Sequence, residues 1–408
     1  MKKLLSAVVI LNCSVLFAQY NGSGSVTQGL ATTTAQNLYS CIGGRTPALG
    51  TITASDNTIW EVPATVNYSD NAFPFASDLY NSCNGSTFST STAALNALDG
   101  SDIVTIDPTG EVITAYIFAD NYFEMYINGI PVGKDNVPYT QFNSNIVRFR
   151  VNRPFTISML LVDWEENLGI GTENNNGSLQ HIGDGGMVAV FKDENDNTVA
   201  ITGPDWKAQT FYTSPIKDLS CPTENGTYRL SSNCNIADSQ DGSNYYGLHW
   251  NKPNGWMNEL FDDSSWPNAT TYTNVAIGVD NKPAYMNFIS IFDDQNQDAQ
   301  FIWSTNVNLD NEVIVRYTVD LSTGLIENQK EVIPFKIQPN PAYDYLELDI
   351  DLKIESEVYV SITDSKGGLV YEKTSYTQPI DISGLQKGIY ILQAELNGQE
   401  SFQRFLVE

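Results

Sequence analysis

The strongest constraint on the fold is a regular alternation of apolar and polar side chains from Ile337 to the end of the chain. Successive side chains of a strand point to opposite faces, so this alternation predicts strands with one buried face. A turn signal from Asp364 to Gly368 separates two of these strands. The segment therefore predicts a small antiparallel β-sandwich. The alternating apolar positions include Leu346, Leu348, Ile350, Leu352, Val358, Val360 and Ile362.

The same segment carries short motifs in a fixed order. They are Pro339-Asn340-Pro341, Asp364 with Gly367, Ile380-Asp381 with Ser383 and Leu385, and Gly388 with Tyr390. Together they resemble the type A C-terminal sorting domain of the type IX secretion system found in Bacteroidetes. Family members usually end in a basic residue, whereas this chain has Arg404 and ends in Glu408. The resemblance implies handling by the type IX secretion machinery and delivery to the medium or to the outer cell surface. An ordinary adhesive sandwich is the alternative.

Residues 1–18, at the other end of the chain, have the pattern of a secretory signal peptide. Lys2 and Lys3 precede an apolar-rich stretch, and Ala18 supplies the small residue that favours cleavage. A membrane anchor is the alternative, but about 14 apolar-rich residues are fewer than the roughly 20 that a spanning helix needs. No transmembrane anchor is therefore expected after cleavage. A lipidated Cys13 fits poorly because Asn12 precedes it.

Chain length and the positions of turn-forming residues divide the rest of the chain into domains. The 408 residues predict two or three domains at about 100 to 200 residues each. Turn-forming residues break the periodicity at 320–334, which we interpret as a linker to the sorting domain at 335–408. Residues 96–319 form the predicted body. Residues 19–95 match no family that we can name, and they either pack on the body or form a separate small lobe.

Strand and turn signals recur throughout the body, so the predicted fold class is all-β, with a jelly-roll β-sandwich followed by the small C-terminal antiparallel β-sandwich. Asn128-Gly129 between alternating runs predicts a hairpin. Residues 93–98 predict one short helix. The predicted strands are Ile103–Ile106, Val112–Phe118, Ile146–Val151, Phe155–Val162, Met187–Phe191, Ala284–Phe292, Phe301–Trp303 and Val313–Val319.

The hairpin itself, from Ala119 to Gly129, resembles one seen in galactose-binding-like jelly rolls, and Phe261 to Trp266 resembles another strand of that family. The resemblance implies a module that binds sugars or other small polar ligands, often with Ca²⁺ in a loop. It transfers no ligand residues. In such domains the residues corresponding to Asp120, Asn121 and Tyr126 usually support the fold.

Charge and cysteines limit the partners. The chain has 48 acidic and 21 basic residues and a formal charge of -27, which excludes nucleic-acid binding through a basic face. Export implies an oxidising compartment, and four cysteines outside the signal peptide allow three disulfide pairings. We favour the pairing that is local in sequence, Cys41 with Cys83 and Cys221 with Cys234. No Cys-x-x-Cys spacing or paired histidines indicate a zinc site.

Sugar binding needs an aromatic face and nearby polar groups. The loop from Gly247 to Trp256 offers Trp250, Asn251 and Trp256, and a second candidate is Asp163 with Trp164. Burial of these tryptophans as core anchors is the alternative. For Ca²⁺, which takes oxygen ligands, two acidic clusters are candidates. The first contains Asp193 and Asp196, the second Asp293, Asp294 and Asp298, and a solvated turn is the alternative for each.

We therefore expect a secreted, non-catalytic protein that binds a polysaccharide or glycan. A polysaccharide-degrading enzyme and a structural surface-layer component are the alternatives. Enzyme signals are weak because the chain has only two histidines, no Gly-x-Ser-x-Gly motif and no phosphate-binding loop. A glycosidase needs only two carboxylates, for which Asp163, Glu165 and Glu166 are the candidates.

Overall fold

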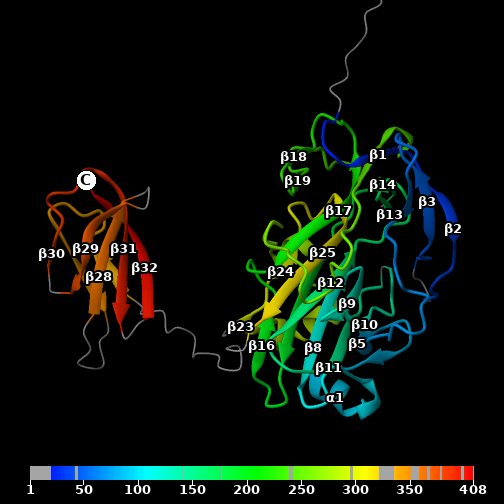
Figure 1. The fold of residues 1–408 in the computed structure, drawn as a ribbon, viewed down its shortest axis with the longest axis horizontal. Helices are drawn as coiled ribbons and strands as arrows, with labels where there is room; N and C mark the ends of the chain where they lie inside the picture. The colour runs from blue at the N-terminus through cyan, green and yellow to red at the C-terminus, as the bar shows by residue number, and fades with distance from the viewer. Residues whose placement is uncertain are drawn as a thin grey trace, which may run out of the picture. The chain divides into compact units, whose positions relative to one another are not determined.

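The computed structural model describes residues 20–41, 45–139, 141–175, 177–238, 242–294, 297–320, 335–350, 358–364, 368–376, 379–396 and 399–407. The predicted signal peptide, nearly all of the predicted linker and Gly367 lie outside these ranges. The chain divides into two compact units, residues 1–324 and 325–408 (Figure 1). Within the described residues, no helix has both the length and the apolar character that a bilayer crossing requires.

Two β-sheets build the first unit, as the all-β prediction expected. Sheet 1 runs, in order across the sheet, β1 (Ser25–Gln28), β20 (Tyr246–His249), β17 (Lys207–Ile216), β25 (Asp310–Val319), β12 (Phe155–Val162), β9 (Tyr122–Ile127) and β10 (Ile130–Lys134). Sheet 2 runs β21 (Thr270–Tyr272), β24 (Phe301–Trp303), β15 (Gly186–Lys192), β8 (Glu111–Asp120), β11 (Ser144–Val151), β5 (Ser77–Asn81) and β6 (Ser86–Thr87), with β16 (Thr198–Ile201) beside β15 and β7 (Ile103–Thr105) beside β11.

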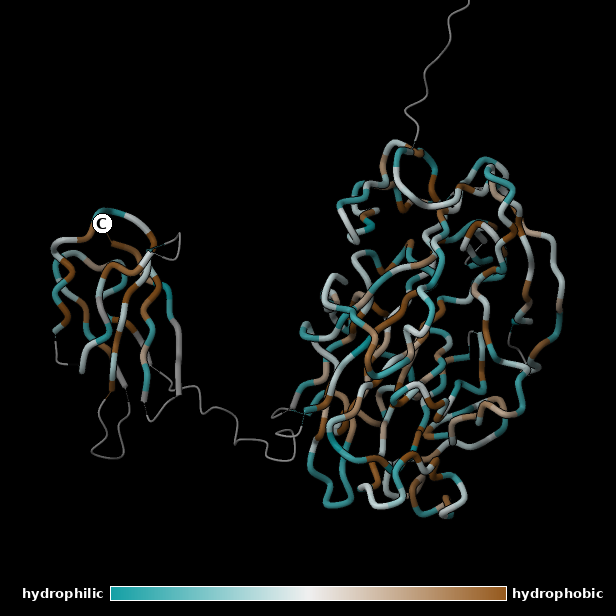
Figure 2. Tube along the Cα trace, viewed as in Figure 1, coloured by the Kyte–Doolittle hydropathy of each residue, from teal (hydrophilic) through white to brown (hydrophobic). Residues whose placement is uncertain are grey.

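The two sheets share one hydrophobic core. Met125 and Met159 of sheet 1 pack in the same cluster as Ile117 and Phe149 of sheet 2, and the ring of Phe149 lies 5.7 Å from that of Phe155. Such a continuous contact between the inner faces is what holds a β-sandwich together. In Figure 2 much of the hydrophobic colour follows these strands, and many of the outer loops are hydrophilic.

Sheet 1 is buried on its outer face as well. Every residue of β12 is buried: Met159 and Leu161 face the shared core, whereas Leu160 and Val162 face a second cluster beneath the covering loops. A strand covered on both faces has a continuous apolar sequence rather than an alternating one. This explains the continuous apolar run from Met159 to Val162, which follows the alternation of residues 155–159.

The predicted hairpin is present between β9 and β10. Asn128 and Gly129 have φ values of 50° and 83°, as a type I′ turn requires at both central positions. Helix α1 (Ser91–Asn96) covers most of the predicted helical turn, and the Thr90 side chain accepts a hydrogen bond from the backbone N–H of Ala93 at its N-terminus.

One predicted strand is wrong. Residues 284–292 form two short helices, α3 (Pro283–Met286) and α4 (Ile289–Phe292). Pro283 has a fixed φ that suits the first helical position. The buried residues are Ala284, Tyr285, Phe288, Ile291 and Phe292, a spacing of three to four residues that places them on one helical face, whereas Met286 and Ile289 are exposed. A short, mostly apolar run does not by itself distinguish a strand from helical turns. Helix α2 (Asn274–Ile277) precedes them.

The N-terminal segment contributes to both sheets. Ser25 to Gln28 pair with β20 at the edge of sheet 1, and β5 pairs with β11 in sheet 2. The segment also forms a small sheet of its own, β2 (Thr32–Ala35), β3 (Leu49–Thr53) and β4 (Ile59–Val62). Strands from the described part of residues 20–95 therefore pair with strands of the body in both sheets.

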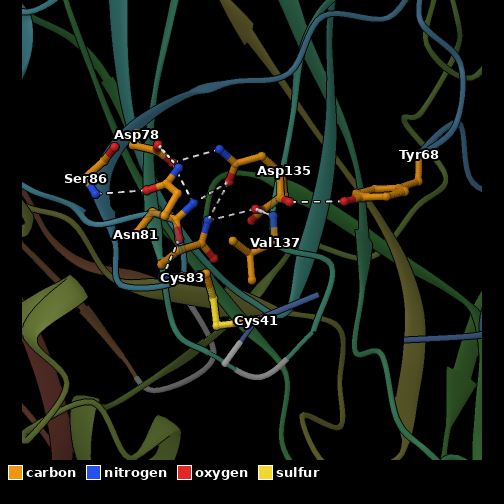
Figure 3. Close-up of a disulfide and its surroundings, with 11 residues drawn as sticks. Cys41, Tyr68, Asp78, Asn81, Cys83, Ser86, Asp135 and Val137 are labelled. Carbon is orange, nitrogen blue, oxygen red and sulfur yellow. Dashed lines mark hydrogen bonds between the residues drawn. A yellow bond between two sulfur atoms is a disulfide. The ribbon is translucent and has the colours of Figure 1, made fainter. Parts of the chain in front are cut away.

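Both favoured disulfides are present. Cys41 bonds to Cys83, and Cys221 to Cys234. Beside Cys83, the amide of Asn81 and the carboxylate of Asp78 belong to a polar network that extends to Asp135 (Figure 3). Short elements complete this unit: η1 (Gly100–Asp102), β13 (Glu173–Asn175), β14 (Ser178–His181), β18 (Thr223–Asn225), β19 (Tyr228–Leu230), η2 (Gly242–Asn244), β22 (Asp293–Asp294) and β23 (Gln297–Asp298).

The second unit is the predicted small antiparallel sandwich. One sheet contains β26 (Phe335–Gln338), β27 (Tyr345–Ile350) and β30 (Ile380–Asp381), and the other β29 (Leu369–Ser375), β28 (Val358–Asp364), β31 (Gly388–Leu396) and β32 (Gln399–Val407). The alternation is confirmed where it is described: Leu346, Leu348, Val358, Val360 and Ile362 are buried in one core. Asp364 accepts a hydrogen bond from the backbone N–H of Gly368, which closes the predicted turn.

Candidate functional site

The three tryptophans proposed as sugar contacts are buried. Trp250 and Trp256 are each 6% exposed and Trp164 is 1% exposed, and all three pack against the outer face of sheet 1. Their polar atoms are occupied in part: the indole N–H of Trp164 donates to the carbonyl of Ala48. This burial agrees with the alternative that the rings anchor the core. Asn251, between them in sequence, is exposed.

The acidic clusters proposed for Ca²⁺ lie in turns. Asp193 accepts hydrogen bonds from Asn195 and Asn197 within the β15–β16 turn, and Asp196 pairs with Lys192 at 3.0 Å. Asp293 accepts a hydrogen bond from the hydroxyl of Tyr285, and the pairing of β22 with β23 places Asp298 opposite Asp293 and Gln297 opposite Asp294. Among the described side chains, no three His, Cys, Asp or Glu residues gather as a metal would require. A Ca²⁺ role for these residues stays a prediction.

A different group of carboxyl groups shares one cavity at the end of the sandwich. Asp120 is the last residue of β8, Asp163 follows β12 directly, and Asp184 precedes β15. Glu165 and Glu173 complete the group, which we call the acidic pocket. Its volume is about 330 Å³, within the range typical of small-molecule sites. The remaining lining includes Arg45, Asn121, Phe142, Asn175, His181 and Lys282.

Strand geometry brings these side chains together. Asp120 lies opposite Gly186 in the β8–β15 pair, so Asp184 comes close to it in sheet 2. The chain then crosses to sheet 1, where the backbone N–H of Asn121 donates to the carbonyl of Val162 at 3.2 Å. The side-chain oxygen of Asn121 accepts from the backbone N–H of Trp164. These bonds hold the ends of β8 and β12 against each other.

The carboxyl groups of Asp163 and Glu165 have no hydrogen-bond donor among the described residues, although Asp163 is 3% and Glu165 is 6% exposed. One oxygen of Asp184 is also buried without a partner. Buried polar groups are normally hydrogen-bonded, and the unmade bond of the Asp184 oxygen costs about 1 to 3 kcal/mol, whereas the oxygens of Asp163 and Glu165 are not fully buried. Gly183 permits this arrangement, because a Cβ there would lie 2.2 Å from an oxygen of Glu165.

Burial also changes the acidity of the pocket. Desolvation raises the pKa of Asp120, of Asp163 and of Glu165 well above its ordinary value, and the neighbouring carboxylates raise each further. The same causes raise the pKa of Asp184 to about 6. Near neutral pH the pocket therefore holds carboxylic acids that can donate as well as accept hydrogen bonds.

The basic residues of the pocket offset only part of this acidity. Arg45 pairs with Glu173, and its guanidinium lies 3.7 Å from Glu166. Lys282 lies 4.4 Å from the centre of the Phe142 ring, and its charge lowers the pKa of Asp120 and of Asp184 by less than burial raises it. Strongly perturbed carboxyl groups in a cavity are typical of binding and catalytic sites.

Sequence reasoning identified part of this pocket. Asp163 was a predicted ligand residue, and Glu165 was among the glycosidase candidates, whereas Glu166 lies outside the cavity lining. Asp120 and Asn121 were interpreted as fold-supporting residues, and Asn121 does make such bonds. Glu173, Asp184, Arg45 and Lys282 were missed. Glu173 and Asp184 lie in the Gly- and Asn-rich stretch of residues 169–186, whose composition indicates a loop but no partner, and no local pattern marks Arg45 or Lys282.

The comparisons with known proteins concern the second unit. Residues 336–408 match the model of the secretion system C-terminal sorting domain. The chain matches no curated protein and no solved structure. The resemblance of the body to galactose-binding-like jelly rolls thus stays a prediction.

The match agrees with the motifs found in the sequence. Pro339, Asn340, Pro341, Asp364, Gly388 and Tyr390 all fall within it, as does Gly367. Asn340 connects the start of the segment to its last strand, since its side-chain oxygen accepts from the backbone N–H of Leu406. Residues 336–408 are therefore a type IX secretion C-terminal sorting domain, and the protein that carries them is secreted or attached to the outer cell surface.

Proposed function

We propose that the first unit is a non-catalytic glycan-binding domain and that a terminal sugar residue enters the acidic pocket. The observation that carries the proposal is the pair of buried carboxyl groups, Asp163 and Glu165, which face a cavity without a donor from the described residues. Sugar hydroxyls are both donors and acceptors, so they match carboxyl and amide groups that lack partners. Asn121 and Asn175 supply amides in the same cavity, and Phe142 supplies an apolar surface.

Binding of the full chain to a broad glycan array tests the proposal. We expect a selective signal that Asp163→Asn or Glu165→Gln reduces at least tenfold. Asp262→Asn, in an exposed loop, is the matched control and keeps the signal. Repeating the array with a chelator separates a Ca²⁺-dependent site from a metal-independent one. An array without signal in both conditions contradicts the proposal.

A second function, glycoside hydrolysis, is favoured by one observation. The raised pKa of Glu165 and Asp163 keeps a proton available near neutral pH, as a general acid requires. If this function holds, the protein releases reducing ends from a polysaccharide, and Glu165→Gln abolishes the release while binding is retained. Binding without turnover of the bound glycan contradicts hydrolysis and leaves the binding proposal in place.

A further inference from the structure

We infer that the acidic pocket selects a sugar residue with a free, protonated amine over neutral sugars. This inference rests on the proposed glycan-binding function and names the class of ligand. It follows from the charge of the cavity, from the missing hydrogen bonds of its buried carboxyl groups and from its size.

The charge of the cavity is unbalanced. Asp120, Asp163, Glu165, Glu173 and Asp184 contribute five carboxyl groups, and Arg45, Lys282 and His181 are the basic side chains of the lining. Arg45 is engaged with Glu173 and Glu166 and also donates to the carbonyl of Asn174. The Nζ of Lys282 makes no ion pair with a described carboxylate and lies over Phe142. A cation that enters the cavity therefore favours the ionised form of these carboxyl groups and is attracted to it, whereas a neutral group is not.

An ammonium group matches the missing hydrogen bonds. It has three donors and no acceptor, whereas a hydroxyl has one donor. Asp163, Glu165 and the buried oxygen of Asp184 offer acceptors once they are ionised. Because burial raises the pKa of these groups, the empty pocket holds protons, and an entering ammonium displaces them. Binding is then accompanied by proton release.

The size of the cavity favours an amino sugar over a bare metal ion as its ligand. A cavity of about 330 Å³ is far larger than an ion occupies, since a water molecule has a share of roughly 30 Å³ in the liquid. The described His, Cys, Asp and Glu side chains form no group of three suited to a metal. The lining instead combines carboxyl groups with the amides of Asn121 and Asn175 and the ring of Phe142. One pyranose ring with an amine uses all three kinds of group.

The test compares ligands that differ at one position. The full chain is titrated calorimetrically, at about pH 6, with a chitosan tetramer, its fully N-acetylated counterpart and cellotetraose. We expect the chitosan tetramer to bind at least tenfold more tightly than the other two. In two buffers of different ionisation enthalpy, the observed heats should differ in the direction of proton release.

Variants test whether the preference for the amine arises in the acidic pocket. Asp163→Asn and Glu165→Gln should each remove the preference for the amine, and Lys282→Gln should strengthen it because a competing cation is lost. Asp262→Asn keeps the wild-type values. Thermal unfolding of each variant confirms that it is folded, so that a loss of selectivity is not a loss of structure.

Three other outcomes would contradict the inference that the pocket selects an amine. Equal affinity for all three tetramers, lost in Asp163→Asn, overturns the amine inference but leaves the glycan-binding function intact. No binding of these tetramers or of any glycan on the array overturns both. A thermal shift produced by Ca²⁺ alone and lost in Glu165→Gln overturns the inference by assigning the cavity to a metal.

Discussion

Glu124 of β9 and Asp163 at the end of β12 belong to neighbouring strands of sheet 1 and are both buried, yet their carboxyl groups have opposite surroundings. Glu124 accepts hydrogen bonds from the backbone and side chain of Asn67 and from the hydroxyls of Tyr122 and Tyr126. Asp163 accepts none from a described residue. Burial alone therefore does not identify a site in this protein. The difference in hydrogen bonding separates a structural acid from a candidate binding acid.

The largest expected effect is at the satisfied acid. Glu124→Ala leaves the donors of Asn67, Tyr122 and Tyr126 buried without an acceptor, so we expect the free energy of unfolding of the body to fall by about 4 kcal/mol. Urea unfolding measures this change. Glu61→Ala, at an exposed position of β4, is the control and should change it by less than about 0.5 kcal/mol. If Glu124→Ala and Glu61→Ala lowered the free energy of unfolding equally, the hydrogen bonds of Glu124 would not stabilise the fold. Glu124 would then no longer differ from Asp163 as a structural acid.

The hydrogen bonding of Asp135 is intermediate between that of Glu124 and that of Asp163. One of its carboxyl oxygens is hydrogen-bonded to Val137 and Asn143, and the other has no partner among the described residues. Burial raises its pKa to about 8. A raised pKa contributes stability below the unfolded-state value near pH 4, and this contribution is lost as the pH rises through about 8. We expect a loss on the order of 3 kcal/mol between about pH 5 and pH 9.

Asp135→Asn should flatten this part of the pH profile, since the amide keeps an acceptor for Asn143 and does not titrate. Urea unfolding at a series of pH values measures the slope. Asp184, whose pKa burial raises to about 6, also loses its proton in this window, so the double variant that adds Asp184→Asn should flatten the profile further. An unchanged slope in Asp135→Asn contradicts the raised pKa.

The unpartnered acids should respond in the opposite direction to Glu124. Asp163→Asn or Glu165→Gln removes a buried carboxyl group whose ionised form is disfavoured by burial and by its neighbours, so we expect the stability lost at high pH to be smaller by about 1 kcal/mol, together with the loss of ligand binding. Thermal unfolding and calorimetric titration of the same samples give both values. A destabilised Asp163→Asn protein would show that this carboxyl group supports the fold.

The smallest effect is expected at Glu166, which is adjacent to Glu165 in sequence but lies outside the cavity lining. Its side chain is 24% exposed and lies 3.7 Å from Arg45. Partly exposed ion pairs contribute little, so Glu166→Gln should change the free energy of unfolding by less than about 0.5 kcal/mol. Glycan affinity should also stay within twofold of wild type. A large loss of affinity would extend the site beyond the pocket described above.

Several features could be predicted from sequence because neighbouring residues create them. The alternation at Leu346 and Leu348 places a buried face, and Asn128-Gly129 adopts the two positive φ values of its turn. The pairing of Cys41 with Cys83 was preferred because it is local. Residues 284–292 show the limit of this reasoning, since their apolar run satisfies both a buried strand and buried helical turns, and tertiary packing selects the helices.

The sequence by itself determined the sorting domain, the all-β class and the local turns, since each depends on side-chain patterns only a few residues apart. Tertiary structure alone decided the acidic pocket and the burial of Trp164, Trp250 and Trp256. Asp120 and Asp184 reach the cavity from sheet 2, and Asp163 and Glu165 reach it from the end of a strand in sheet 1. Whether a carboxyl group there meets a donor depends on the pairing of distant strands, which no local pattern encodes.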